Sequence, residues 1–158
     1  MKLYSNSLIC NILKYIDENI CNKITINDLE QKFFYNRFYI MKLFKKELKI
    51  TLIDYLNKMR IYKAIMLIKE TDNSLLNIAF KSGFYSIEYF SETFKNIIGL
   101  NPQIAKHYLK QTKKITSNQI EVINHAIIEL YKLKQFKEKY LLNEKPNILP
   151  TKKLTIFK

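Results

Sequence analysis

The stretch IAFKSGFYSIEYFSETFKNIIGLNP, residues 78–102, decides the fold of this chain. Gly83 ends a short helix there, because glycine adopts the left-handed conformation without strain. Ser86 then caps a second helix, whose apolar residues recur at the helical period as far as Gly99. The stretch therefore predicts a short helix, a tight turn and a longer helix over residues 74–98.

The same pattern occurs once earlier in the chain, over residues 25–48. Thr25 is a good N-cap, and Asp28 stands three residues later, where its side chain can complete a capping box. Asn36 can cap the second helix of this unit. Between the two units, residues 51–71 predict one amphipathic helix, roughly 30 Å long.

Composition favours an all-α fold, with two helix-turn-helix subdomains, a long linker helix and a C-terminal helical extension. Of the 158 residues, 47% are hydrophobic, which is enough to bury a core, and only 2 are Gly and 3 are Pro. So few turn residues exclude most hairpin-based and barrel folds. We expect one domain over residues 7–110 and a lysine-rich extension over residues 111–158. The extension contains a predicted helix over residues 117–141, ended by Pro146 and Pro150.

Charge indicates the kind of partner. The chain carries 27 Lys and Arg residues against 14 Asp and Glu residues, a formal net charge of +13. A field of this sign attracts polyanions, so nucleic acid or an anionic membrane surface is the expected partner. No stretch approaches the ~18 uncharged apolar residues of a membrane span, and the first residues lack the apolar segment of a signal peptide. A cytoplasmic protein is therefore predicted.

The residue types that enzymes and metal sites need are sparse. Cys10 and Cys21 offer neither a metal quartet nor a disulfide framework. His107 and His125 have no second ligand at metal-binding spacing. There is no glycine-rich phosphate loop, and neither cysteine has a base beside it in the sequence. We expect no enzyme activity, no cofactor and no metal.

Paired helix-turn-helix units point to double-stranded DNA. In such a unit the second helix enters the major groove by its N-terminal residues, while the first lies across the backbone. A linker of roughly 30 Å is close to the ~34 Å between successive major-groove faces, so a monomer can read two adjacent segments. Ile87 is expected to be exposed on the second reading helix, and Tyr89 to face inward. The base-reading candidates are Arg37, Phe38, Met41 and Lys42 in the first unit, and Ser86, Ile87, Glu88, Ser91 and Glu92 in the second.

Each kind of candidate suits a chemical group on a base edge. Arg37 or Lys42 can donate to guanine O6 and N7. Phe38 or Met41 can meet a thymine methyl group, and Glu92 can accept from cytosine N4. Solvated helix faces are the alternative interpretation. Contacts to phosphates are expected from lysines and helix N-termini, at Thr25, Asn36, Lys45, Lys46, Ser74, Lys81 and Lys95.

These residues resemble the AraC/XylS family of transcriptional regulators, over about residues 8–109. In the second unit the resemblance is carried by Ile78-Ala79-Phe80-Lys81-Ser82-Gly83-Phe84, then Tyr89-Phe90, Phe94-Lys95 and Gly99-Leu100-Asn101-Pro102, in the family's order and spacing. In the first unit the matching residues are Phe44-Lys45-Lys46-Glu47, Thr51, Tyr55-Leu56, Arg60 and Ala64. The chain departs from the family pattern at Glu30 (usually Ala), Phe34 and Lys49 (often Gly), Glu92 (commonly basic) and Ala105 (commonly aromatic).

The resemblance is greatest to small family members that consist mainly of the DNA-binding domain. It implies a sequence-specific transcriptional regulator, more often an activator, that binds an asymmetric site as a monomer and contacts RNA polymerase. It also implies a bacterial protein that lies on the nucleoid when bound. Neither end of this sequence has room for a family effector domain, so no small-molecule effector is expected.

A second hypothesis belongs to a different class. The chain would be a basic helical interaction module whose degenerate motifs no longer read DNA, with residues 117–141 binding an anionic membrane or a partner helix. The charge of the extension and the carboxylate of Glu92 favour it. For residues 117–141 the structural interpretation is preferred: a helix that docks on residues 1–110 or on a second subunit.

Overall fold

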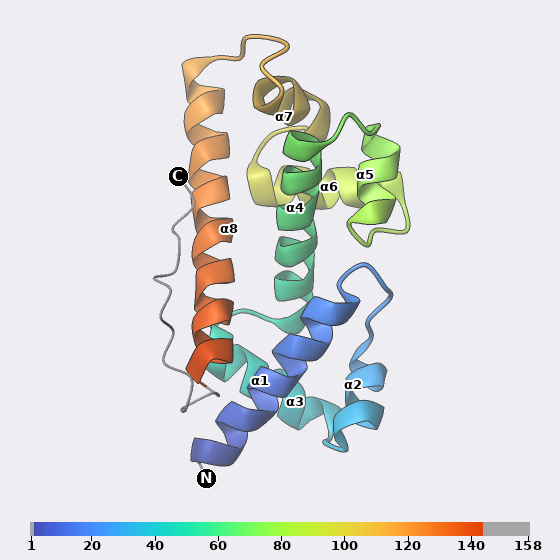
Figure 1. Ribbon diagram of the computed structural model, residues 1–158, viewed down its shortest axis with the longest axis vertical. Helices are drawn as coiled ribbons and strands as arrows, with labels where there is room; N and C mark the ends of the chain where they lie inside the picture. The colour runs from blue at the N-terminus through green and yellow to red at the C-terminus, as the bar shows by residue number, and fades with distance from the viewer. Residues whose placement is uncertain (1, 144–158) are drawn as a thin grey trace.

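Helices are the only regular structure in residues 2–143, the part of the chain that the computed structural model describes, with side chains for residues 7–142. The all-α prediction, two helix-turn-helix units joined by a long helix and followed by a helical extension, is confirmed. Pro146 and Pro150, the residues expected to end the last helix, lie outside the described residues. The helices are α1 (Lys2–Asn19), α2 (Ile26–Phe33), α3 (Arg37–Leu48), α4 (Leu52–Glu70), α5 (Leu75–Lys81), α6 (Ile87–Ile98), α7 (Pro102–Leu109) and α8 (Ser117–Asn143) (Figure 1).

Two hydrophobic cores occupy the two ends of the molecule, and α4 belongs to both (Figure 1). α1, α2 and α3 pack around its first half, and α5, α6 and α7 around its second half. At 3.6 residues per turn, the buried residues of the two halves lie on roughly opposite sides of α4. Each half therefore serves a different unit. The buried residues of α4 are Tyr55, Leu56 and Met59 in the first core, and Ile61, Ala64, Ile65 and Ile68 in the second.

The C-terminal helix α8 runs lengthwise beside α4 and packs on both units (Figure 1). Ile123 and Leu130 are buried in the second core, whereas Leu133 and Leu141 pack against the first. The helix expected over residues 117–141 thus docks on the rest of its own chain. The boundary predicted at residue 110 stays a prediction.

Two side chains in the C-terminal half of α8 donate to carboxylates of the first unit and hold α8 against it. The Lys137 Nζ, on a buried side chain, donates to Asp17 Oδ1 on α1. The Tyr140 hydroxyl donates to Glu47 Oε2 on α3 at 2.6 Å. Burial, and then the hydrogen bond to the Glu47 carboxylate, raise the pKa of Tyr140 to about 12. α8 is therefore attached to α3 as well as to α1.

The turn of the second unit packs closely against the first unit. Gly83 has a φ of +97°, and a Cβ there would lie 2.5 Å from the carbonyl oxygen of Ile20. Beside it, the guanidinium of Arg60 donates to the carbonyl oxygens of Ile20 and Asn22, at 3.0 and 2.9 Å. Only glycine satisfies both the backbone conformation and this approach.

In the first unit, two residues stand in the left-handed conformation where the family often has glycine. Phe34 has a φ of +59° after α2, and Lys49 has a φ of +64° after α3. Each amide donates to the carbonyl four residues earlier, Phe34 to Glu30 and Lys49 to Lys45. The departures from glycine leave the turn geometry in place, at a cost of roughly 1–2 kcal/mol per residue.

Glu30 fastens α3 to α2 across that turn. Its Oε1 accepts from the backbone N–H of Arg37 at 2.7 Å, and its Oε2 accepts from the Arg37 Nε and Nη2 at 3.0 and 2.7 Å. These hydrogen bonds hold the pKa of Glu30 below its usual value. One carboxylate thus satisfies a free amide at the start of α3 and neutralises the first cation of that helix.

Removing the side chain of Leu130, one of the two α8 residues buried in the second core, should destabilise the protein. Leu130→Ala should lower the free energy of unfolding by about 2–5 kcal/mol, because it leaves a cavity at a buried position. Ile128→Ala, two residues earlier on the exposed side of α8, should change it by less than ~0.5 kcal/mol. Urea unfolding monitored by circular dichroism measures both values, and equal effects would show that α8 does not pack as described.

The Glu30–Arg37 pair should contribute stability that depends on pH. Because the pKa of folded Glu30 is depressed, the contribution is present above the unfolded-state pKa and is lost as the pH falls through the folded-state pKa. Wild type should therefore be more stable than Glu30→Gln at pH 7, and the difference should shrink below about pH 4. A difference in urea midpoint that stays constant from pH 7 to pH 2.5 would contradict this role of the carboxylate.

Candidate nucleic-acid interface

The four candidates on α3 share one exposed face. Arg37, Phe38, Met41 and Lys42 are exposed, whereas Ile40, Leu43 and Phe44 on the other side of the helix are buried. Asn36 caps this helix, its Oδ1 accepting from the amide of Phe38 at 2.8 Å. The structure therefore brings these four residues together at the first two turns of α3, but it pairs the guanidinium of Arg37 with Glu30.

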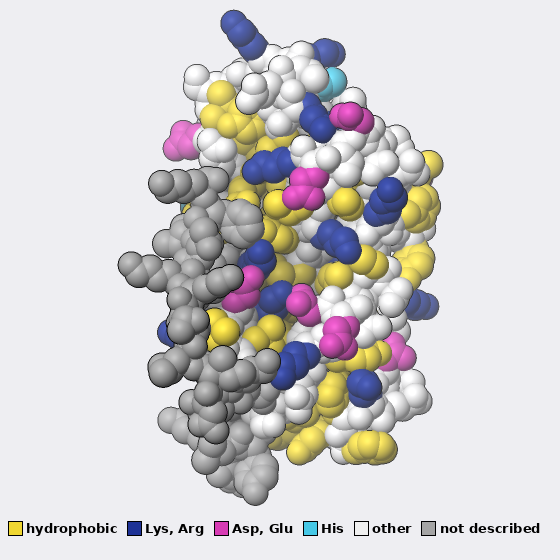
Figure 2. All heavy atoms as spheres, viewed as in Figure 1, with side chains coloured by type: hydrophobic (Ala, Val, Ile, Leu, Met, Phe, Trp, Pro, Cys, Tyr) yellow, Lys and Arg dark blue, Asp and Glu magenta, His cyan; other side chains and the backbone are white. Residues whose placement is uncertain are grey.

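Exposed aromatic rings surround the start of α3. The side chain of Phe34 is 91% exposed and that of Phe38 is 74% exposed. Tyr35 and Tyr39 are also exposed, and their rings stack with centroids 5.4 Å apart. Hydrophobic side chains gather at the lower end of the molecule, where α2 and α3 lie, and along the edge beside α5 (Figure 2). The sequence pattern did not identify Phe34, Tyr35 and Tyr39 as part of this surface.

The candidates on α6 are less uniform. Glu88 and Glu92 are exposed, and Ser91 is half-buried. Ser86 is the N-cap: its Oγ accepts from the amide of Tyr89 and donates to Glu88 Oε2, which lowers the pKa of Glu88. The surface of α6 therefore presents two carboxylates, whereas that of α3 presents cations and apolar groups.

Two expectations about α6 are wrong. Ile87 is half-buried and packs against the second core, rather than being exposed. Tyr89 does not face inward: it is 45% exposed, and its hydroxyl accepts from Asn57 Nδ2 on α4 at 2.9 Å. Residues 87 and 89 are two positions apart, about 200° around the helix, so they lie on nearly opposite sides of α6, and the side packed against the core carries Ile87. Tyr89 is thus an additional exposed residue of this surface.

The phosphate candidates fall into two groups. The lysine side chains are all exposed: Lys45, Lys46, Lys81 and Lys95. The helix-capping residues already make hydrogen bonds within the chain. The Ser74 Oγ accepts from the amide of Asn77 at 3.3 Å. The amide and hydroxyl of Thr25 both donate to Asp28 Oδ2 at 2.7 Å, so a carboxylate already occupies the N-terminus of α2.

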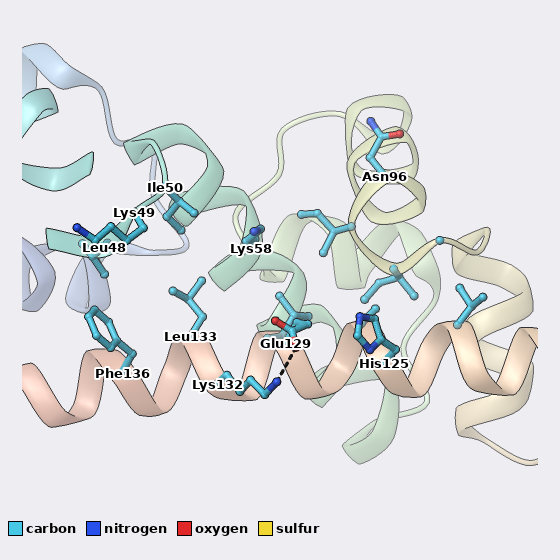
Figure 3. Close-up of a pocket in the computed structure, with 16 residues that line it drawn as sticks. Leu48, Lys49, Ile50, Lys58, Asn96, His125, Glu129, Lys132, Leu133 and Phe136 are labelled. Atoms are coloured by element: carbon cyan, nitrogen blue, oxygen red, sulfur yellow. Dashed lines mark hydrogen bonds and ion pairs between the residues drawn. The ribbon is translucent and has the colours of Figure 1, made fainter. Parts of the chain in front are cut away.

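A groove of about 750 Å³ lies between α8 and the C-terminal ends of α3 and α6 (Figure 3). Leu48 and Ile50 line one side of the groove, and Leu133 and Phe136 line the other side from α8. Lys132 and Glu129 of α8 also line the groove, and they form an ion pair with Nζ and Oε1 2.8 Å apart. None of the candidate base-reading residues lines this groove. It is therefore distinct from the surface formed by the N-terminal turns of α3 and α6.

The part of the chain that the structure describes contains neither a metal-binding cluster nor a membrane-spanning helix. No three His, Cys, Asp or Glu side chains lie close enough together there to hold a metal ion. None of the described helices has the length and apolar character that crossing a bilayer requires.

Comparison with known proteins gives the family. A helix-turn-helix domain family matches residues 29–112, which is more than half of the chain and ends before α8. The melibiose operon regulatory protein of Escherichia coli strain K12 is 32% identical over 106 residues, which cover 67% of this chain and 35% of that protein. The HTH-type transcriptional activator AarP of Providencia stuartii is 28% identical over 101 residues, covering 64% of this chain and 75% of that protein.

Solved structures agree with this match. The C-terminal domain of AraT, a response regulator from Geobacillus stearothermophilus, superposes with a TM-score of 0.62 at 25% identity, covering 70% of this chain and 88% of that domain. The chain spans about a third of the length of the melibiose operon regulatory protein. The match over residues 29–112 and the paired units around α4 together show that this chain belongs to the AraC-type helix-turn-helix family of transcriptional regulators.

Proposed function

We propose that this chain binds double-stranded DNA in a sequence-specific manner and regulates transcription, by placing α3 and α6 in two adjacent major-groove segments. The observation that carries the proposal is the sharing of α4 by both cores, which holds two second helices of helix-turn-helix units in one fixed arrangement. α4 has 19 residues, so it is about 28 Å long. That length is comparable with the ~34 Å that separates successive major-groove faces on one side of a duplex.

The proposed base contacts differ between the two helices. On α3, Lys42 donates to guanine, and Phe38 and Met41 contact apolar base edges. On α6, the carboxylates of Glu88 and Glu92 accept from the amino groups of cytosine or adenine, and Ser91 serves either kind of base. Three further candidates already make contacts within the chain. Arg37 forms an ion pair with Glu30, Ser86 caps α6, and Ile87 packs against the second core.

The phosphate contacts position the protein without reading sequence. Lys45 and Lys46 extend the cationic surface of α3, and Lys81 and Lys95 lie on α5 and α6. The N-terminus near Ser74 adds partial positive charge that favours a phosphate oxygen. The N-termini of α3 at Asn36 and of α2 at Thr25 are the weaker members of this set, because the carboxylates of Glu30 and Asp28 already accept from backbone amides there.

The finer features of the proposal concern its partners. The chain acts in the cytoplasm, associated with the nucleoid when bound, as a monomer on an asymmetric site. It contacts RNA polymerase and activates transcription, which the description of AarP as a transcriptional activator supports. The proposal includes no small-molecule effector and no catalysis.

Selection of bound sequences from a random duplex pool tests the proposal. At about 150 mM salt, binding driven only by lysines and phosphates is suppressed. One asymmetric motif with two blocks about one helical turn apart is expected. No enrichment of any sequence would contradict the proposal and favour a basic helical module that binds a membrane or a protein partner.

Two neighbouring lysines on α3 should behave differently on the selected site. Lys42→Ala should cost about 1–3 kcal/mol of binding free energy and relax the preference at one base pair, because it removes a donor to a base edge. Lys45→Ala should weaken binding to all sequences alike and reduce the slope of log affinity against log salt by about 1. Fluorescence anisotropy titrations at three salt concentrations measure both, and an unchanged base preference in Lys42→Ala would reject its reading role.

A further inference from the structure

We infer that the DNA block under α3 is recognised by its thymine methyl groups, through the side chains of Phe38 and Met41. The inference rests on the proposed function and names the base chemistry that this half of the surface takes. Large apolar side chains are exposed at the N-terminal end of α3, the end that is proposed to enter the major groove. Phe38 is 74% exposed and Met41 is 49% exposed, whereas Ile40 and Phe44 of the same helix are fully buried.

An exposed apolar surface of this kind marks a contact with a partner. Phe38 and Met41 stand three positions apart, so they lie on the same side of α3. Phe34, which is 91% exposed, continues the apolar surface into the turn before the helix. In the major groove, the thymine C5-methyl is the one apolar group that a base pair presents. Apolar side chains on the entering turns of a reading helix are therefore complementary to thymine.

Glu30 makes a hydrogen bond from Arg37 to guanine less favourable at this end of α3. The Nε and Nη2 of Arg37, one of the two pairs of guanidinium atoms that can donate in a bidentate contact to guanine, both donate to Glu30 Oε2. Glu30 also accepts from the amide of Arg37, so the carboxylate is held by the start of the helix itself. A guanine contact through Nε and Nη2 would have to replace a charge-assisted contact that the folded protein already makes.

The second reading helix has the opposite chemistry and provides an internal comparison. On α6, Glu88 and Glu92 are exposed acceptors, and the exposed ring of Tyr89 is tied through its hydroxyl to Asn57. Carboxylates require amino groups on the bases and gain nothing from a methyl group. Loss of the thymine methyl should therefore affect one of the two blocks and leave the other.

Two parallel selections test the inference. One random duplex pool contains thymine, and a matched pool contains uracil in its place, which removes only the C5-methyl group. Wild type should recover two full blocks from the thymine pool. From the uracil pool it should recover the α6 block in full, but the α3 block only at the position that Lys42 is proposed to read. On the selected site, replacing a single contacted thymine with uracil should weaken binding about fourfold, the effect of burying one apolar carbon.

Variants assign the effect to α3. The double variant Phe38→Ala, Met41→Ala should recover from the thymine pool the same reduced α3 block that wild type recovers from the uracil pool, with the α6 block in full. Both side chains are largely exposed, and circular dichroism should show an unchanged helical fold. Ile128→Ala, which removes a similarly exposed apolar side chain from α8, should recover both blocks in full.

The outcomes separate the inference from the proposed function. The same two-block motif from both pools would overturn the thymine inference while leaving DNA binding intact, and would point to a protein partner for the apolar surface. A double variant that still recovers both blocks in full would overturn the assignment to Phe38 and Met41. No motif from either pool would overturn the inference together with the proposed function.

Discussion

The fold depends on α4, which contributes buried residues to both hydrophobic cores. Tyr55, Leu56 and Met59 anchor the first half of α4 in one core, and the buried residues of its second half lie in the other, on roughly the opposite side of the helix. Because a single α-helix is stiff over 19 residues, each unit fixes the direction of the other. Two further contacts also hold the units in one relative orientation. Gly83 lies close to the carbonyl of Ile20, and α8 packs along both units.

The two units are alike in backbone and different in chemistry. Both consist of a short helix, a tight turn and a 12-residue helix with a polar N-cap. The first reaches its left-handed turns with Phe34 and Lys49, whereas the second uses glycine at Gly83 and Gly99. The exposed side of α3 combines apolar rings with cations, whereas that of α6 carries carboxylates. One scaffold thus presents two surfaces of different chemistry, as the proposed reading of an asymmetric site requires.

Local features of this fold could be predicted from the sequence because they depend on nearest neighbours. The caps at Thr25, Asn36 and Ser86 follow from residue type and spacing, and the helical period of apolar residues identified most of both cores. Contacts between side chains on different helices could not be predicted in this way. The pairing of Glu30 with Arg37 spans a turn whose shape depends on the left-handed Phe34, and the hydroxyl of Tyr89 accepts from Asn57, 32 residues earlier on α4. The path of α8 across both units follows from packing, which an amphipathic pattern alone leaves open.

The central claim is that α3 and α6 are held at one fixed separation, and the affinity for altered sites tests it most directly. Base pairs are inserted one at a time between the two blocks of the selected DNA site, up to about one helical turn. If the units are rigidly joined, every insertion should reduce the affinity to that of a site with one block scrambled, including an insertion of a full turn. Affinity that is retained after a full-turn insertion would show that the two units move independently, and would contradict the account.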